Sequence, residues 1–147
     1  TIYSLRESVA NALQRSARNE GSDRMLSGKE LAVIKRADAD GGAVKEILAD
    51  LARREVDMTR ERTSVFARSV IEYMSGSTNL KENPDRSAAF IVLKSAKVPS
   101  ILIELGYVTN EEDAEQLKSA QWREKVSGSI LTAIDNYFSH QMARLPM

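Results

Sequence analysis

The sequence predicts an α/β fold in which a mixed sheet is sandwiched by helices, within a single domain spanning residues 1–147. Three short strand-like segments alternate with helical stretches. Two of them, A-A-F-I-V-L-K at 88–94 and S-I-L-I-E-L at 100–105, are continuous apolar runs typical of interior strands covered on both faces. Because three strands make a thin sheet, we expect this sheet to be incomplete, with further strands upstream of Thr1.

The first forty residues are expected to hold one strand and one helix. Thr1–Leu5 has the composition of a strand, and 8–19 has the apolar spacing of a helix with Ser8 as its N-cap. From 22 to 42 the apolar pattern is weak, and glycines mark turns. We therefore expect a loop containing a short helix there.

A long amphipathic helix is predicted at about 42–74, a stretch rich in Ala, Leu, Arg and Glu without Pro or Gly after its start. At 100° per residue its apolar residues form one stripe, with the charged residues Glu55 and Arg62 near the middle. Either the helix exposes part of this stripe or pairs these charges with buried partners, or the stripe covers a polar cavity into which Glu55 points. The stripe consists of Val44, Ile47, Leu48, Leu51, Met58, Val65, Phe66 and Tyr73.

The second half is expected to hold a loop at 75–86, the two apolar strands and two helices. Asn110 is a suitable N-cap for a helix ending at Lys118, since three acids follow it at the positive end of the helix. The last helix is predicted at 122–138, and the tail at 139–147 is expected to fray. Its core face is expected to consist of Trp122, Val126, Ile130, Ala133, Ile134 and Tyr137.

Composition narrows the classes of function. The 21 Lys and Arg balance the 21 Asp and Glu, so a strongly charged surface for nucleic acid is not expected. No apolar run is long enough for a membrane span, and the absence of cysteine excludes disulfides and thiolate zinc sites. The start at T-I-Y-S-L-R, without Met or the form of a signal peptide, is typical of a processed product or a fragment.

Few residues can carry chemistry. The sequence has no glycine-rich phosphate loop and no nucleophile elbow, and its one histidine, His140, lies in the tail. A zinc site made of this chain's own histidines is therefore not expected.

Glu104 is the strongest candidate for a functional residue. It lies in an apolar strand just before Gly106, at a strand end where α/β sheets often place their chemistry. An ionised side chain buried there costs several kcal/mol unless something offsets it. The alternative is a buried structural ion pair with an arginine such as Arg62, and the spacing alone leaves both possibilities open.

Residues 87–138 resemble the C-terminal part of the zinc-dependent N-acetylmuramoyl-L-alanine amidases of the amidase-3 type, which are cell-wall hydrolases. The matching signature is S-A-A-F-I-V-L-K-S-A-K-V-P-S-I-L-I-E-L-G-Y-V-T-N-E-E-D, followed by L-K-S-A-Q-W-R-E-K-V-S-G-S-I-L-T-A-I-D-N-Y-F. Thr1–Leu5 looks like the strand that follows the family's second zinc histidine.

The resemblance implies a role for Glu104. In the family motif P-x-x-L-x-E-x-G-[FY] the glutamate is catalytic, and Tyr107 occupies the position where Phe is common. The implied reaction is hydrolysis of the amide between N-acetylmuramic acid and L-alanine of the peptidoglycan stem by a zinc-activated water. The family's zinc ligands, two histidines and a glutamate, lie upstream of Thr1, so this chain is expected to be inactive without the missing N-terminal half.

The resemblance also implies regulation. In division-associated amidases an inserted helix covers the zinc cleft until an activator protein displaces it, and 42–74 resembles that insertion. Glu55 is then the acid expected to contact zinc in the resting enzyme, with Arg62 in a supporting role. A cell-wall substrate implies a periplasmic or otherwise extracytoplasmic location.

Two other functions remain open from the sequence. One is a non-catalytic cell-wall binding or regulatory module that lacks the metal site. The other is an unrelated α/β interaction domain, which would have no affinity for zinc or peptidoglycan.

Overall fold

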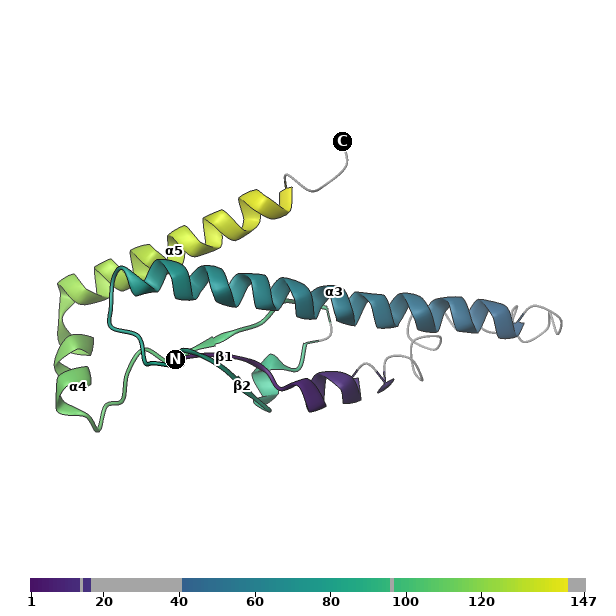
Figure 1. Ribbon diagram of the computed structural model, residues 1–147, viewed down its shortest axis with the longest axis horizontal. Coiled ribbons are helices and arrows are strands. Elements are labelled where there is room, and N and C mark those ends of the chain that lie inside the picture. The colour runs from purple at the N-terminus through teal and green to yellow at the C-terminus, as the bar shows by residue number, and fades with distance from the viewer. Residues whose placement is uncertain (14, 17–40, 96, 143–147) are drawn as a thin grey trace.

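The structure, a computed structural model, describes residues 1–13, 15–16, 41–95 and 97–142, and these form a small sheet with helices packed against it (Figure 1). The sheet order is β2-β1-β3, with β1 parallel to β2 and antiparallel to β3. This confirms an α/β fold with a mixed sheet. In chain order the elements are β1 (Ile2–Leu5), α3 (Gly41–Ser75), β2 (Asp85–Ala88), η1 (Ile91–Leu93), β3 (Leu102–Ile103), α4 (Glu111–Lys118) and α5 (Ala120–Met142).

The two faces of the sheet differ in how well they are covered. Ile2 pairs with Ile103 in β3, is 1% exposed, and belongs to the core cluster that includes residues of α3 and α5. The next pair, Tyr3 with Leu102, points to the opposite face because side chains alternate along a strand. Leu102 is 37% exposed there, and Phe90, whose ring meets that of Tyr3 edge-on, is 43% exposed. We call this second face the open face.

The two apolar runs do not form the interior strands that the sequence predicts. The first strand lies upstream of its predicted position, at Asp85–Ala88, and Ile91–Leu93 form a turn of 3-10 helix instead. The second run contributes only Leu102–Ile103. Both strands lie at the edges of the sheet, with β1 between them. The prediction was wrong because an apolar run does not indicate which strands pair with it, even though it indicates burial.

The long predicted helix is confirmed as α3, but its buried face is a different one. Three large members of the predicted stripe are exposed, Ile47 at 67%, Leu51 at 52% and Met58 at 48%. The buried positions recur every three or four residues and are mostly small side chains, which allow close approach to the sheet and α5. They are Ala52, Val56, Thr59, Thr63, Ala67, Val70 and Met74.

The predicted final helix is confirmed as α5, which runs antiparallel to α3. Phe66 of α3 packs against Tyr137 with ring centroids 5.1 Å apart, whereas the indole nitrogen of Trp122 donates to Thr78 Oγ1 just beyond the end of α3 at 3.3 Å. Helix α5 continues to Met142, so the prediction of fraying was wrong for 139–142. Residues 143–147 lie outside the described residues.

The remaining predictions concern the first forty residues and α4. The strand at the N-terminus is confirmed, and residues 7–13 and 15–16 are helical. Ser8 lies inside that helix, because the amides of Val9 and Ala10 already bond to the Arg6 carbonyl. The predicted loop lies almost entirely outside the described residues. Asn110 is confirmed as the N-cap of α4, since its side chain accepts from the Asp113 amide at 2.9 Å.

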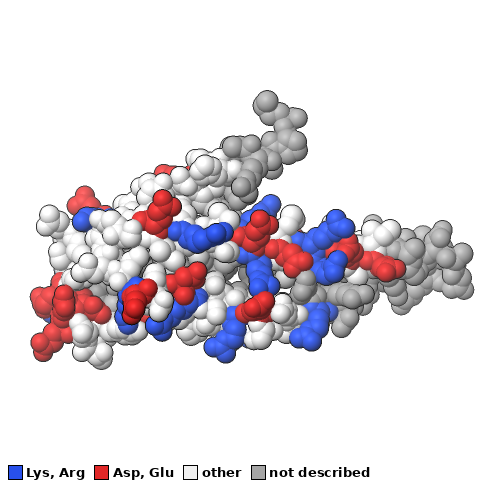
Figure 2. Space-filling view, viewed as in Figure 1, with Lys and Arg blue, Asp and Glu red and all other residues white. Residues whose placement is uncertain are grey.

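Charge is mixed over the surface. On the face shown in Figure 2, acidic and basic side chains alternate along the molecule, and the acids of the first turn of α4 lie at one end. Within the described ranges, no helix has the length and apolarity needed to cross a bilayer.

Candidate active site

Glu104 lies at the end of the sheet beside Thr1, the residue that precedes β1. It follows β3 directly, and its backbone amide donates to the Thr1 carbonyl at 2.8 Å. The Thr1 nitrogen donates back to the Glu104 carbonyl at 2.9 Å. The register of β1 and β3 therefore continues by one pair, Thr1 with Glu104, and both the amide and the carbonyl of Glu104 are bonded to Thr1.

The side chain of Glu104 belongs to the open face. Because side chains alternate along a strand, Glu104 shares a face with Leu102 and, across the strand pair, with Tyr3. Its side chain is half-buried rather than buried, so the predicted desolvation by an apolar strand holds only in part. A ligand approaching the open face can reach this carboxylate.

A tyrosine and a lysine lie next to the carboxylate. Tyr107 Oη donates to Glu104 Oε2 at 3.3 Å, and Lys81 Nζ donates to Tyr107 Oη at 3.3 Å. The Lys81 ammonium also lies 4.3 Å from the centroid of the Tyr107 ring, which is cation–π geometry. The three side chains thus form one connected polar chain at the end of β3.

The turn after Glu104 is anchored to α4. Asp113 Oδ2 accepts from the Tyr107 amide at 2.9 Å, and Asn110 orients Asp113 through the N-cap bond. Gly106 lies in tight contact with α4, since a Cβ there would lie 3.2 Å from Asp113 Cβ. The E-L-G-Y sequence and the first turn of α4 therefore form one packed unit.

Arg62 does not pair with Glu104. Its side chain is exposed on α3, and its charge acts on Tyr137 of α5. Burial raises the pKa of Tyr137 above its ordinary value, and the nearby Arg62 charge opposes that rise. Among the ion pairs of the described residues none joins Arg62 to Glu104, so the alternative of a structural pair with Arg62 finds no support.

Glu55 and Glu104 lie at different levels of the molecule. Glu55 is half-buried in the N-terminal half of α3, the part that extends beyond the sheet in Figure 1. The β1 end beside Glu104 instead belongs with the C-terminal half of α3, because Ile2 shares its core cluster with Ala67, Val70 and Met74. Fifteen residues of helix separate Glu55 from Val70, roughly 22 Å along the axis.

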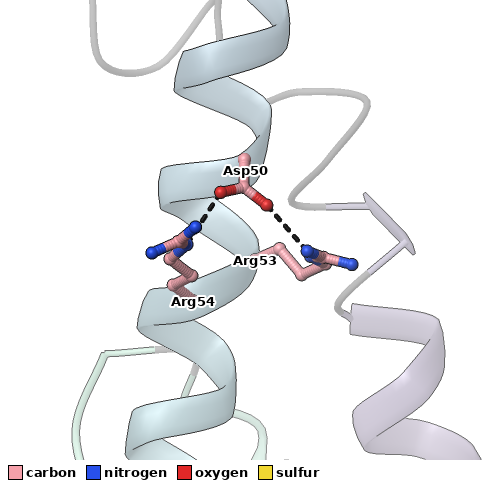
Figure 3. Close-up of polar contacts among 3 residues, drawn as sticks. All are labelled: Asp50, Arg53 and Arg54. Atoms are coloured by element: carbon pink, nitrogen blue, oxygen red, sulfur yellow. Dashed lines mark hydrogen bonds and ion pairs between the residues drawn. The ribbon is translucent and has the colours of Figure 1, made fainter.

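Two arginines next to Glu55 on α3, Arg53 and Arg54, form ion pairs with Asp50. Figure 3 shows Asp50 between two arginines, with Arg53 and Arg54 each donating to a different carboxylate oxygen at 2.7 Å. The hydrogen bond from Arg53 has the largest effect on Asp50, and together with the bond from Arg54 it holds the pKa of Asp50 below its ordinary value. The surface beside Glu55 is thus an ordered set of ion pairs.

The sequence matches the profile of the Amidase_3 family, described as N-acetylmuramoyl-L-alanine amidase, over residues 10–136. The chain belongs to this amidase family. It is 29% identical over 117 residues to N-acetylmuramoyl-L-alanine amidase AmiA of Escherichia coli (strain K12), covering 80% of this chain and 39% of AmiA. It is 35% identical over 74 residues to AmiC of Escherichia coli O6:H1, covering 50% of this chain and 18% of AmiC. The chain thus spans well under half the length of these relatives.

The described part of this amidase chain does not itself form a metal site. No group of three or more His, Cys, Asp or Glu side chains is close enough there to hold an ion. His140 is exposed in the last turn of α5, far along the chain from the Glu104 turn. The donor set around Glu104 consists of a phenol and an ammonium, which do not suit zinc.

A cavity of about 310 Å³ lies at the other end of β1 from Glu104. Its wall is rich in hydroxyl groups and includes the ion pair between Arg60 and Glu7, which are 3.1 Å apart. Neither Glu104 nor Glu55 lines it. The cavity predicted beneath the Glu55 stripe is therefore not this one.

Lys81, Tyr107 and Asp113 are the site residues that sequence reasoning missed. Tyr107 follows Glu104 by three residues in the loop after β3, and their side chains meet at 3.3 Å. Asp113 carried a signal only as an acid in the first turn of a helix. The sequence gives no signal for Lys81, since this residue lies in a loop 26 residues before Tyr107.

Proposed function

We propose that this chain is the C-terminal part of the catalytic domain of a peptidoglycan hydrolase, which cleaves the amide between N-acetylmuramic acid and L-alanine of the stem peptide. The observation that carries the proposal is the position of Glu104, which directly follows β3 on the open face within a family-matched segment. Its substrate implies a periplasmic or otherwise extracytoplasmic location.

Glu104 acts as the general base and acid of this reaction. Its carboxylate takes a proton from the water that attacks the amide carbonyl, and returns the proton to the nitrogen that leaves. The backbone bonds to Thr1 and the contact with Tyr107 keep the carboxylate in place during both transfers. Zinc, when bound by the complete domain, supplies charge stabilisation at the carbonyl oxygen, and its ligands come from residues outside this chain.

The missing N-terminal half of the domain covers the open face. Phe90 and Leu102 are exposed on this face, and further large apolar side chains near them in the sequence are exposed as well, which is unusual for a monomeric domain. Both edge strands also offer unpaired backbone groups to further strands. The exposed side chains are Phe90, Ile91, Val92, Leu102 and Leu105.

A comparison of this chain with the complete domain tests the proposal. The complete domain is expected to bind zinc and to release muropeptides from purified peptidoglycan, whereas residues 1–147 alone are expected to do neither. A complete domain that binds peptidoglycan but releases nothing would contradict hydrolysis and favour the non-catalytic cell-wall module. A complete domain with no affinity for zinc or peptidoglycan would favour an unrelated interaction domain.

A regulatory role for the 42–74 helix is a second proposal, and it rests on the resemblance to division-associated amidases. In it Glu55 contacts zinc in the resting enzyme, Arg62 supports that contact, and an activator protein releases the helix. The separation of roughly 22 Å along α3 requires the N-terminal half of α3 to take another position in the complete domain. Glu55→Ala is expected to raise basal hydrolysis, with Glu61→Ala on the same helix as the control. Unchanged basal hydrolysis in Glu55→Ala would contradict it.

A further inference from the structure

We propose that Tyr107 and Lys81 are positioning residues for Glu104: the Tyr107 hydroxyl, oriented by Lys81, holds Oε2 of the carboxylate and leaves Oε1 to exchange the proton with water. This inference rests on the proposed function. It concerns a hydroxyl that the family motif does not demand, because Phe is common at the position of Tyr107.

The chemistry of the three side chains fixes the direction of the hydrogen bonds. A lysine ammonium has donors only, so Lys81 donates to Tyr107 Oη over their 3.3 Å contact. The single phenolic proton is then directed to the other neighbour of Oη, which is Glu104 Oε2 at 3.3 Å. Because a hydroxyl that accepts from a cation becomes a stronger donor, Lys81 strengthens the bond to the carboxylate.

Both ends of this contact are fixed by the backbone. Glu104 is held by its two bonds with Thr1, and Tyr107 by the bond from its amide to Asp113. The Lys81 ammonium over the ring further limits rotation of the phenol. A carboxylate joined to such a frame has fewer orientations than a glutamate free in a turn, and orientation is what proton transfer requires.

Other charged groups lie near the same end of β1. The charged side chains of Lys81, Arg86, Glu104 and Asp113 all lie near the backbone nitrogen of Thr1. Asp113 is committed to the Tyr107 amide, and Arg86 Nε donates to the Asn83 carbonyl at 3.4 Å. Tyr107 Oη donates directly to the Glu104 carboxylate, and Lys81 reaches that carboxylate only through its bond to Tyr107.

The first test measures kcat and KM separately in the complete domain. Tyr107→Phe is expected to lower kcat about three- to tenfold with KM unchanged, since it removes one hydrogen bond to the reacting group. Lys81→Met is also expected to lower kcat, whereas Lys81→Arg, which keeps the positive charge, is expected to retain the wild-type kcat. Because both residues act through the same contact, adding Lys81→Met to Tyr107→Phe is expected to lower kcat little further. Tyr73→Phe and Lys97→Met are the matched controls.

The second test needs no catalysis, so it separates this inference from the proposed function. In the 147-residue chain, Tyr107→Phe and Lys81→Met are expected to move the carboxyl carbon NMR signal of Glu104 at neutral pH, and Tyr73→Phe is not. An inactive complete domain with this signal shift would contradict the proposed function but keep the contact. A wild-type kcat in Tyr107→Phe, or an unmoved Glu104 signal in both variants, would overturn the positioning role.

Discussion

At the scale of the residue, the sequence predicted where Glu104 lies at the end of a strand but not what surrounds it. The apolar run and the following Gly predicted that Glu104 ends a strand, and the structure places it directly after β3. The contact of Glu104 with Tyr107 and that of Tyr107 with Lys81 depend on the path of two loops, one after β3 and one between α3 and β2. No local sequence pattern predicts that path. The need for Gly106 likewise becomes visible only through the position of Asp113.

Gly106→Ala tests how tightly this turn is packed. A methyl group there would lie 3.2 Å from Asp113 Cβ and 3.3 Å from Asp113 Cγ, so Asp113 must move and its bond to the Tyr107 amide weakens. We expect a loss of about 1 kcal/mol in the free energy of unfolding, measured by urea denaturation. Faster hydrogen exchange at the Tyr107 amide should accompany it.

Gly128→Ala is the control for that substitution. Gly128 lies within α5 and has open space where a Cβ would be, so alanine is expected to stabilise the helix by about 0.5–1 kcal/mol. If Gly106→Ala stabilised the chain equally, the packing of the turn against Asp113 would be refuted.

At the scale of the element, the helices and the core face of α5 were predictable, whereas the face that α3 buries was not. The absence of Pro and Gly located α3, and the Asn110 N-cap located the start of α4. The buried face of α3 was missed because its small residues, such as Ala52, Ala67 and Thr63, carry little apolar signal in the sequence. Contact between helices favours small residues where backbones approach closely, and only the packed structure reveals where that occurs.

Acid pH is expected to loosen the N-terminal half of α3 through Asp50. The pKa of Asp50 in the folded chain is lowered by hydrogen bonds from Arg53 and Arg54, so its stabilising effect is present above the ordinary aspartate pKa. This stabilising effect is lost as the pH falls through the pKa that Asp50 has in the folded chain. The measurement is residue-resolved NMR of α3 across acid pH in wild type and Asp50→Asn, with Glu61→Gln as control. The same acid response in Asp50→Asn and wild type would contradict this role.

Alkaline pH is expected to weaken the contact between α3 and α5 through Tyr137. Burial raises the folded pKa of Tyr137, so its contribution to stability is complete below the unfolded pKa of about 10 and declines as the pH rises through the folded value. Tyr137→Phe should make the stability less dependent on pH above about 10, measured by urea denaturation at a series of pH values. Tyr3→Phe, on the open face, controls for loss of a hydroxyl; an unaltered alkaline slope in Tyr137→Phe would argue against the burial effect.

At the scale of the whole molecule, one face of the sheet is packed and the other is open. The packed face follows from amphipathic helices that sequence reasoning could predict. The open face explains why the apolar runs misled the strand assignment. Their side chains, such as Ile91 at 84% exposed and Val92 at 68%, are apolar but are not buried by the described residues. Their hydrophobicity fits burial by a larger domain, and the chain covers only 39% of AmiA.

The most direct measurement is the rate of muropeptide release by the complete domain carrying Glu104→Gln, which keeps the shape of the side chain but removes its capacity to take a proton. We predict a fall of at least about 100-fold with zinc content unchanged, the scale of a lost general base. The matched control, Glu82→Gln at an exposed position in the loop before β2, should retain the wild-type rate. A wild-type rate in Glu104→Gln would contradict the central role of Glu104.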